Sequence, residues 1–190
     1  AGEVFGACAG AAIYKRRLFD EIGLFDESFH SLAEDVDLNA RARLSDHRAI
    51  YFPKARILHI GSATLGRYSD RYVYLAHRNE SAVLLKNFPL RLFLKNTFAI
   101  LQQHIRTATY FSYRGQGRLL WKAKCDAIFK LFSTMKSRHK TQRLRKLSPT
   151  EFENTMDDQG VRMKVSLIYP PDRNIPGNPY SSLPVLSSCL

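Results

Sequence analysis

The hydrophobic period of this chain changes near residue 69, and this change limits the folds that the chain can adopt. Before it, apolar residues occur in short runs between turn residues, which is typical of the strands and short helices of an α/β protein. After it, apolar residues recur at the three- and four-residue spacing of helices. We therefore expect two regions, residues 1–68 and residues 69–147, with different architectures.

The first region has five predicted elements. The pattern indicates two helices and three strands, with the helices at 15–23 and 34–45 and the strands at 4–14, 49–52 and 55–60. The first predicted strand is rich in small residues, which suits close approach by another backbone or a ligand.

The second region is predicted to be helical, followed by a tail. Helices are expected at 69–87, 90–110 and 118–146, the last two joined by a hinge at 115–117 and both amphipathic. Residues 148–190 are rich in proline and serine, so we expect this tail to be disordered.

The positive charge is confined to one part of the chain. The net charge is +12, and residues 91–146 hold fourteen lysines and arginines against one acid, Asp126. A basic helical region indicates an anionic partner, either membrane lipid or nucleic acid. The long apolar faces and the absence of a recognised nucleic-acid motif favour an anionic membrane surface and no nucleic acid. A solvated helical pair that packs on the rest of the chain is the simpler alternative.

Two further features bound the setting of the protein. Three widely spaced cysteines form no CxxC pair, which favours a reducing compartment. The opening residues AGEVFGACAGAAIY are typical of the middle of a domain, so we expect the chain to be a fragment.

The stretch AEDVDLNARARL places three acids in the first turn of a predicted helix. The helix dipole favours ionised Glu34, Asp35 and Asp37 there. A general base also needs an ionised carboxylate, so the stretch suits either catalysis or an ordinary helix start. We expect Asp37 to be structural and to pair with Arg41 four residues later.

Three residues near position 60 are weaker candidates. His59 lies in a predicted strand among apolar residues, where a histidine is either a core residue or a metal ligand. The hydroxyls of Ser62 and Thr64 follow in a small loop and could contact a phosphate.

The order of these segments carries more information than any one of them. GAAIYKRRLFDEIGLFDESF, EDVDLNAR and PKARILHIGSAT occur in succession, followed by YLAHRNESAVLLKNFP. This series, over about residues 4–88, resembles the C-terminal half of the catalytic domain of family 2 glycosyltransferases, in the rhamnosyltransferase-like branch. The resemblance implies part of a GT-A-type α/β fold, followed here by basic amphipathic helices.

The resemblance also implies roles for individual residues. Asp35 would be the general base, with Glu34 as its orienting neighbour, and would deprotonate an acceptor hydroxyl that attacks a nucleotide-activated sugar with inversion. Gly10 and Ala11 would line the acceptor side, where close packing is the simpler explanation. Arg17 would lie beside the acceptor or the diphosphate, although ordinary surface charge is the simpler explanation.

A divalent metal is implied as well. His59 matches the family's histidine ligand, and Mn²⁺ or Mg²⁺ would suit a set of oxygens and one imidazole. An Asp-x-Asp motif upstream is absent from this sequence, so most metal ligands and the donor site are expected in a missing N-terminal half. The chain alone is therefore expected to be inactive.

The implied partners are a nucleotide-sugar donor and a glycan or lipid-linked acceptor in surface polysaccharide synthesis. The implied location is cytoplasmic, peripheral on the inner face of the plasma membrane. The alternative from another class is a non-catalytic remnant with a basic, membrane-binding helical module.

Overall fold

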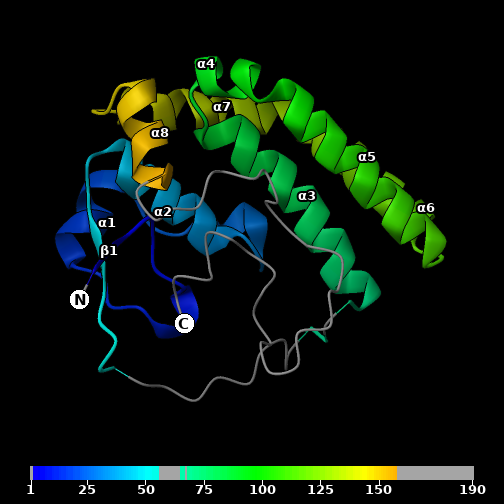
Figure 1. The fold of residues 1–190 in the computed structure, drawn as a ribbon, viewed down its shortest axis with the longest axis horizontal. Coiled ribbons are helices and arrows are strands. Elements are labelled where there is room, and N and C mark those ends of the chain that lie inside the picture. The colour runs from blue at the N-terminus through cyan, green and yellow to red at the C-terminus, as the bar shows by residue number, and fades with distance from the viewer. Residues whose placement is uncertain (1, 56–64, 67, 158–190) are drawn as a thin grey trace.

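The computed structural model describes residues 2–55, 65, 66 and 68–157, and this part of the chain is mostly helical (Figure 1). Its sheet has two strands, β1 (Gly2–Val4) and β2 (Ala49–Tyr51), which pair antiparallel with Gly2 opposite Tyr51. Within the described residues, the predicted α/β class is therefore represented only by this small sheet. The strand predicted at 55–60 lies almost entirely outside them.

The strand predicted at 4–14 is wrong, because β1 spans Gly2–Val4 and shares only Val4 with the predicted range. Strand β1 ends at Val4, and the short 3-10 helix η1 (Ala9–Ala11) follows. The backbone groups in between bond to side chains of the helix α2 (Glu34–Leu44) instead of to a neighbouring strand. A run of small apolar residues does not distinguish these two kinds of partner.

Two helices of the first region are confirmed. Helix α1 (Arg16–Ile22) ends at Gly23, whose φ of 81° is a conformation that glycine adopts readily. Helix α2 matches the helix predicted at 34–45 and packs against α1 and α3 (Asp70–Asn87).

The second region is helical, as predicted, but is divided more finely. Helix α3 begins after Ser69, whose hydroxyl accepts a hydrogen bond from the Tyr72 N–H. The two later predicted helices are broken at Asn96 and Lys130, so that the chain forms α4 (Leu90–Lys95), α5 (Thr97–Tyr113), α6 (Gly117–Phe129) and α7 (Leu131–Arg143). Gly115, with φ of 78°, turns the chain between α5 and α6.

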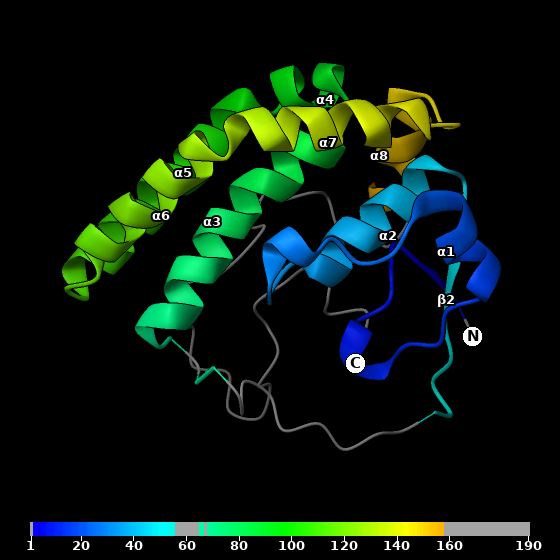
Figure 2. The ribbon, with the colours of Figure 1, turned by 180° about the vertical axis from the view of Figure 1, so that it is seen from behind.

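These helices form a layer beside the small sheet and α2. Helix α3 packs along α6 and α7, and α5 runs beside α6 on the outer side of the molecule (Figures 1 and 2). Among the described residues, no helix has both the length and the apolar content that crossing a bilayer requires.

The first residues of the predicted disordered tail are instead ordered. Helix α8 (Pro149–Asp157) packs against α2 and α4. It starts with a capping box, because the Ser148 hydroxyl accepts from the Glu151 N–H and the Glu151 carboxylate accepts from the Ser148 N–H. The fully buried ring of Phe152 lies against the rings of Phe5 and Phe88, so α8 completes the main hydrophobic core.

Candidate active site

One face of helix α2 binds the backbone that follows β1. Asp35, Asn39 and Arg43 are spaced four residues apart and therefore share this face. The amide of Asn39 donates to the Ala7 carbonyl at 2.8 Å and accepts from the Ala7 N–H at 3.2 Å. The guanidinium of Arg43 donates to the carbonyl oxygens of Val4 and Phe5. This face fixes the loop after β1 along the helix.

Asp35 is held by backbone amides. Its Oδ1 accepts from the Val36 N–H at 2.8 Å and its Oδ2 from the Ala9 N–H at 3.3 Å. Both bonds fix the orientation of the carboxylate. The side chain is almost fully buried, with 9% of the residue exposed. A carboxylate with a fixed orientation at the start of a helix is suited to accept a proton from a bound hydroxyl.

Glu34 lies beside Asp35 in a less favourable environment. Its Oε2 is buried and makes no hydrogen bond within the part of the chain that the structure describes. Burial raises the pKa of Glu34, and the charge of Asp35 raises it further. The two neighbouring carboxylates thus differ. Asp35 accepts from two backbone N–H groups, whereas Oε2 of Glu34 has no hydrogen-bond partner among the described residues.

The backbone just before Glu34 is strained. His30, Leu32 and Ala33 have φ values of 59°, 68° and 70°, in the left-handed region that residues other than glycine rarely adopt. Such residues cost roughly 1–3 kcal/mol each and persist only where the surroundings hold them. Strain of this kind is concentrated at functional sites, and here it directly precedes the two candidate catalytic acids.

Two buried side chains of α3 hold the strained loop. Asn79 donates through Nδ2 to the carbonyl oxygens of Ser31 and Leu32, at 2.9 and 2.7 Å. Arg78 donates to the carbonyl oxygens of Ser28 and Phe29 at 3.0 and 3.1 Å. Arg78 and Asn79 are both buried in the described structure, with 7% and 1% exposed. Their burial and these contacts show that they brace the loop that leads into α2.

The opposite face of α2 ties the helix to the rest of the fold. The predicted pair is confirmed, since Nε of Arg41 lies 2.9 Å from Oδ2 of fully buried Asp37. Asp37 also accepts from the Lys86 ammonium at 2.9 Å and the Asn87 amide at 2.8 Å, both from α3. Arg41 donates to the carbonyl of Ile22 at 2.7 Å, next to the end of α1. Asp37 is thus a structural residue, as expected.

The other described candidates lie at the surface. Gly10 and Ala11 are exposed in η1, directly after the Ala9 amide that binds Asp35. Arg17 is exposed on α1 and pairs with Glu21 at 2.8 Å. Gly10 and Ala11 therefore directly follow the residue whose N–H binds the Asp35 carboxylate. The described contacts of Arg17 lie within its own helix.

His59, Ser62 and Thr64 lie outside the described residues, so their predicted roles stay predictions. Within the described part, no group of three histidine, cysteine or acidic side chains is arranged to hold a metal ion. The carboxylate of Asp35 is already bonded to two amides, and Glu34 lies next to it in the sequence. These residues do not form a complete metal site.

A cavity of about 150 Å³ lies between η2 (Glu27–Phe29) and helices α3, α6 and α7. Its lining is mixed, with Phe29 and Ala127 beside Arg78, Lys86 and Ser133, and it includes neither of the candidate catalytic acids. We place no part of the predicted chemistry there.

The comparisons with known proteins bear on the resemblance. The chain is 29% identical over 113 residues to N-acetylglucosaminyl-diphospho-decaprenol L-rhamnosyltransferase of Mycobacterium tuberculosis, in the CDC 1551 and H37Rv strains alike. The aligned part covers 55% of this chain and 34% of the relative, so it spans about a third of that protein's length. No family model matches the chain, and no solved structure matches it.

This similarity makes the chain a partial homologue of a rhamnosyltransferase, which is a family 2 glycosyltransferase. The transferase resemblance inferred from the motifs is confirmed at that level.

Proposed function

We propose that residues 1–190 form the acceptor-side portion of an inverting glycosyltransferase, which uses a nucleotide-diphosphate sugar as donor. Asp35 accepts the proton of the acceptor hydroxyl as that oxygen attacks the anomeric carbon, and the nucleoside diphosphate leaves. The observation that carries the proposal is Asp35 itself. Two backbone amides hold its carboxylate at the start of α2, after a strained loop, in a chain that is similar to a rhamnosyltransferase.

The donor site is proposed to lie in sequence outside these residues. The relative is about three times as long as the part that aligns with this chain. We therefore expect residues 1–190 alone to be inactive, and the full reading frame that encodes them to be active. The proposed divalent metal, Mn²⁺ or Mg²⁺, would neutralise charge on the departing diphosphate when bound. His59 is its only proposed ligand in this chain.

The acceptor is proposed to be a lipid-linked glycan intermediate, with a free glycan as the broader class. The name of the relative specifies a diphospho-decaprenol acceptor and an L-rhamnosyl group. Such an acceptor lies at a membrane, so we propose that the protein works in surface polysaccharide synthesis. Its proposed location is the cytoplasmic, inner face of the plasma membrane, where it would be peripheral.

A transfer assay tests this function. The full-length protein would be incubated with nucleotide-activated sugars, a lipid-diphosphate acceptor and Mn²⁺ or Mg²⁺, and the lipid product followed by chromatography. We expect sugar transfer that stops when a chelator is added. If the full-length protein transfers no sugar from any nucleotide donor, the non-catalytic remnant becomes the better account.

A further inference from the structure

The outer face of α5 and α6 exposes large apolar side chains that the rest of the described protein does not cover. On α5, Phe98, Leu101 and Ile105 are 79%, 54% and 58% exposed, and their spacing places them on one face. The buried residues of α5, Ile100, Thr107 and Phe111, lie on the opposite face. An amphipathic surface helix normally exposes its polar face, and α5 exposes an apolar one as well.

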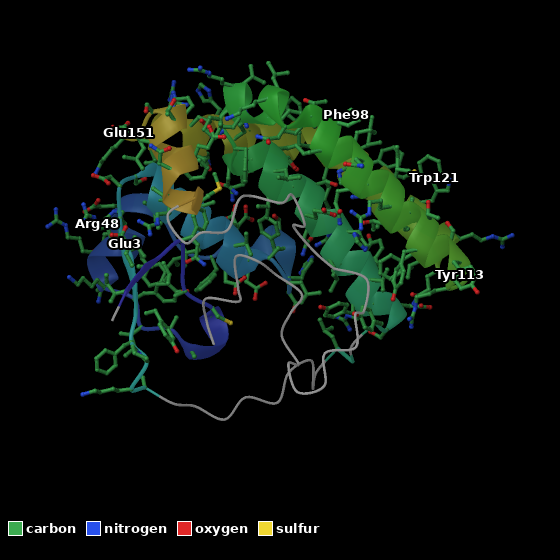
Figure 3. The ribbon with its side chains drawn as sticks, viewed as in Figure 1. Glu3, Arg48, Phe98, Tyr113, Trp121 and Glu151 are labelled. Carbon is green, nitrogen blue, oxygen red and sulfur yellow. The ribbon has the colours of Figure 1, made fainter. Side chains whose placement is uncertain are left out.

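Helix α6 continues this exposed surface. Trp121 and Ile128 are 72% and 66% exposed and share a face of α6, and Phe132 follows at the start of α7 with 86% exposed. Phe98, Trp121 and Tyr113 lie along the same outer edge of the molecule (Figure 3). We call this surface the outer face and define it by Phe98, Leu101, Ile105, Trp121 and Ile128. Apolar clusters of this kind mark sites of protein or membrane contact.

Cations without ion-pair partners accompany the outer face. Arg106 on α5, Arg118 on α6 and Lys130 at the end of α6 are exposed and form no ion pair among the described residues. The one acid of segment 91–146, Asp126, accepts a hydrogen bond from the Tyr74 hydroxyl on α3. Fourteen lysines and arginines against this one acid give segment 91–146 a strongly positive net charge.

We propose that the outer face docks on the surface of an anionic bilayer. Its aromatic and aliphatic side chains enter the region of the headgroups and upper acyl chains, while the flanking cations contact lipid phosphates. The helices lie in the plane of the surface and do not cross it. A nucleic acid would fit this face less well, because interfaces with nucleic acids are polar, whereas the centre of this one is aliphatic and aromatic.

This docking adds a partner to the proposed function. Its purpose, to bring the enzyme to a lipid-linked acceptor, rests on that function. Binding to the bilayer does not depend on sugar transfer, however. The two proposals can therefore fail separately.

The chain carries its own probe of this docking. Trp121 is the only tryptophan of the protein, and it lies in the outer face. The full chain would be titrated with vesicles of phosphatidylglycerol and phosphatidylcholine, and with vesicles of phosphatidylcholine alone. We expect a blue shift of Trp121 emission and quenching by brominated lipid with the anionic vesicles, and a much weaker response without phosphatidylglycerol. An unchanged emission spectrum with anionic vesicles would overturn the proposal.

A pair of matched variants separates the outer face from general charge attraction. Ile105→Asp removes an apolar group from the face, whereas Ile50→Asp changes a residue of β2 that is similarly exposed, at 61% against 58%. We expect Ile105→Asp to weaken vesicle partitioning about tenfold or more, and Ile50→Asp to leave it nearly unchanged. Equal binding by both variants would contradict the assignment of this face.

Further outcomes separate the rival occupants and the proposed function. Binding to RNA but not to vesicles, or a dimer of the chain that Ile105→Asp dissociates, would also overturn the proposal. Asp35→Asn should bind vesicles as the unchanged chain does. An Ile105→Asp full-length enzyme that loses vesicle binding but still transfers sugar to a water-soluble acceptor supports both proposals. A full-length protein that binds vesicles through this face but transfers no sugar would refute only the proposed function.

Discussion

At the scale of single residues, the candidate base is positioned by its own backbone environment. The two carboxylate oxygens of Asp35 accept from the N–H groups of Val36 and Ala9, and Glu34 makes no described hydrogen bond to it. The loop that supplies the Ala9 amide is fixed in turn by Asn39, one turn further along α2. The geometry of Asp35 therefore depends on a short stretch of backbone as much as on any charged neighbour.

The first prediction concerns Gly6, at the start of that loop. A Cβ at this position would lie 2.3 Å from Cγ of Asn39, and the two bonds to Ala7 hold that amide in place. Gly6→Ala should lower the free energy of unfolding by roughly 1–3 kcal/mol. Gly2→Ala is the matched control, since nothing lies within 4 Å of its added carbon. Urea denaturation of both variants checks this, and equal stability would contradict the described packing.

The second prediction concerns the pH dependence that Glu34 introduces. Its pKa is raised by burial, so the folded chain binds the proton more tightly than the unfolded chain does. Stability from this group is thus present at pH below the unfolded pKa and is lost as pH rises through the raised folded value. Glu34→Gln should therefore increase the melting temperature at pH 7, and the gain should disappear toward pH 4.

Calorimetry across this pH range measures the difference between Glu34→Gln and the unchanged chain. Glu27→Gln, at an exposed position in η2, serves as the control. The quantity compared is the difference in melting temperature between Glu34→Gln and the unchanged chain. If this difference were more negative at pH 7 than at pH 4, the ionised carboxylate of Glu34 would be stabilising and the prediction would be wrong.

At the scale of elements, α2 connects the parts of the fold through both of its faces. One face binds the segment after β1, and the other binds α1 and α3 through Arg41 and Asp37. Nine of its eleven residues are buried, including five that are polar or charged. A helix this polar and this buried is stable only because nearly every charged group has a partner.

The third prediction removes one of those partners. Asp37→Ala would leave the buried cations Arg41 and Lys86 without their shared carboxylate, although Lys86 keeps Asp26 at 2.6 Å. We expect a loss of about 3–5 kcal/mol, because an uncompensated buried charge is costly. Arg17→Ala breaks an exposed pair and should leave the stability nearly unchanged. Thermal unfolding of the two variants provides the comparison, and similar losses would contradict the role of Asp37.

The elements show what local sequence can and cannot predict. The residue pattern of the sequence predicted α1, α2 and α3, because its signals lie within each helix. The strand assigned to 4–14 failed because its partner is a set of side chains far along the chain. Helix α8 is not predicted although Ser148 and Glu151 carry the capping-box pattern, because the proline-rich composition of residues 148–190 indicates disorder.

The candidate site was predictable to a similar extent. The acid cluster and its family resemblance led to Asp35 and Glu34, and the Asp37–Arg41 spacing predicted a pair that the structure contains. The strained backbone and its clamp by Asn79 could not be foreseen, since they depend on contacts between residues almost fifty positions apart.

At the scale of the whole molecule, two surfaces with different chemistry lie on different parts of the fold. The candidate base lies at the start of α2, near the exposed residues of η1. The outer face, with its cations, lies on α5 and α6 on the far side of α3 (Figure 1). This division suits an enzyme that rests on a bilayer and receives a lipid-linked acceptor, which is the combination that we propose.

The most direct test of this account is the rate of sugar transfer by the Asp35→Asn form of the full-length protein. Asparagine keeps the shape and can still accept from one of the two amides, but it cannot accept the acceptor proton. We predict a fall in kcat of about 10²–10⁴-fold, with donor affinity and circular dichroism unchanged. Transfer by Asp35→Asn at the rate of the unchanged enzyme would contradict the assignment of Asp35 as the base.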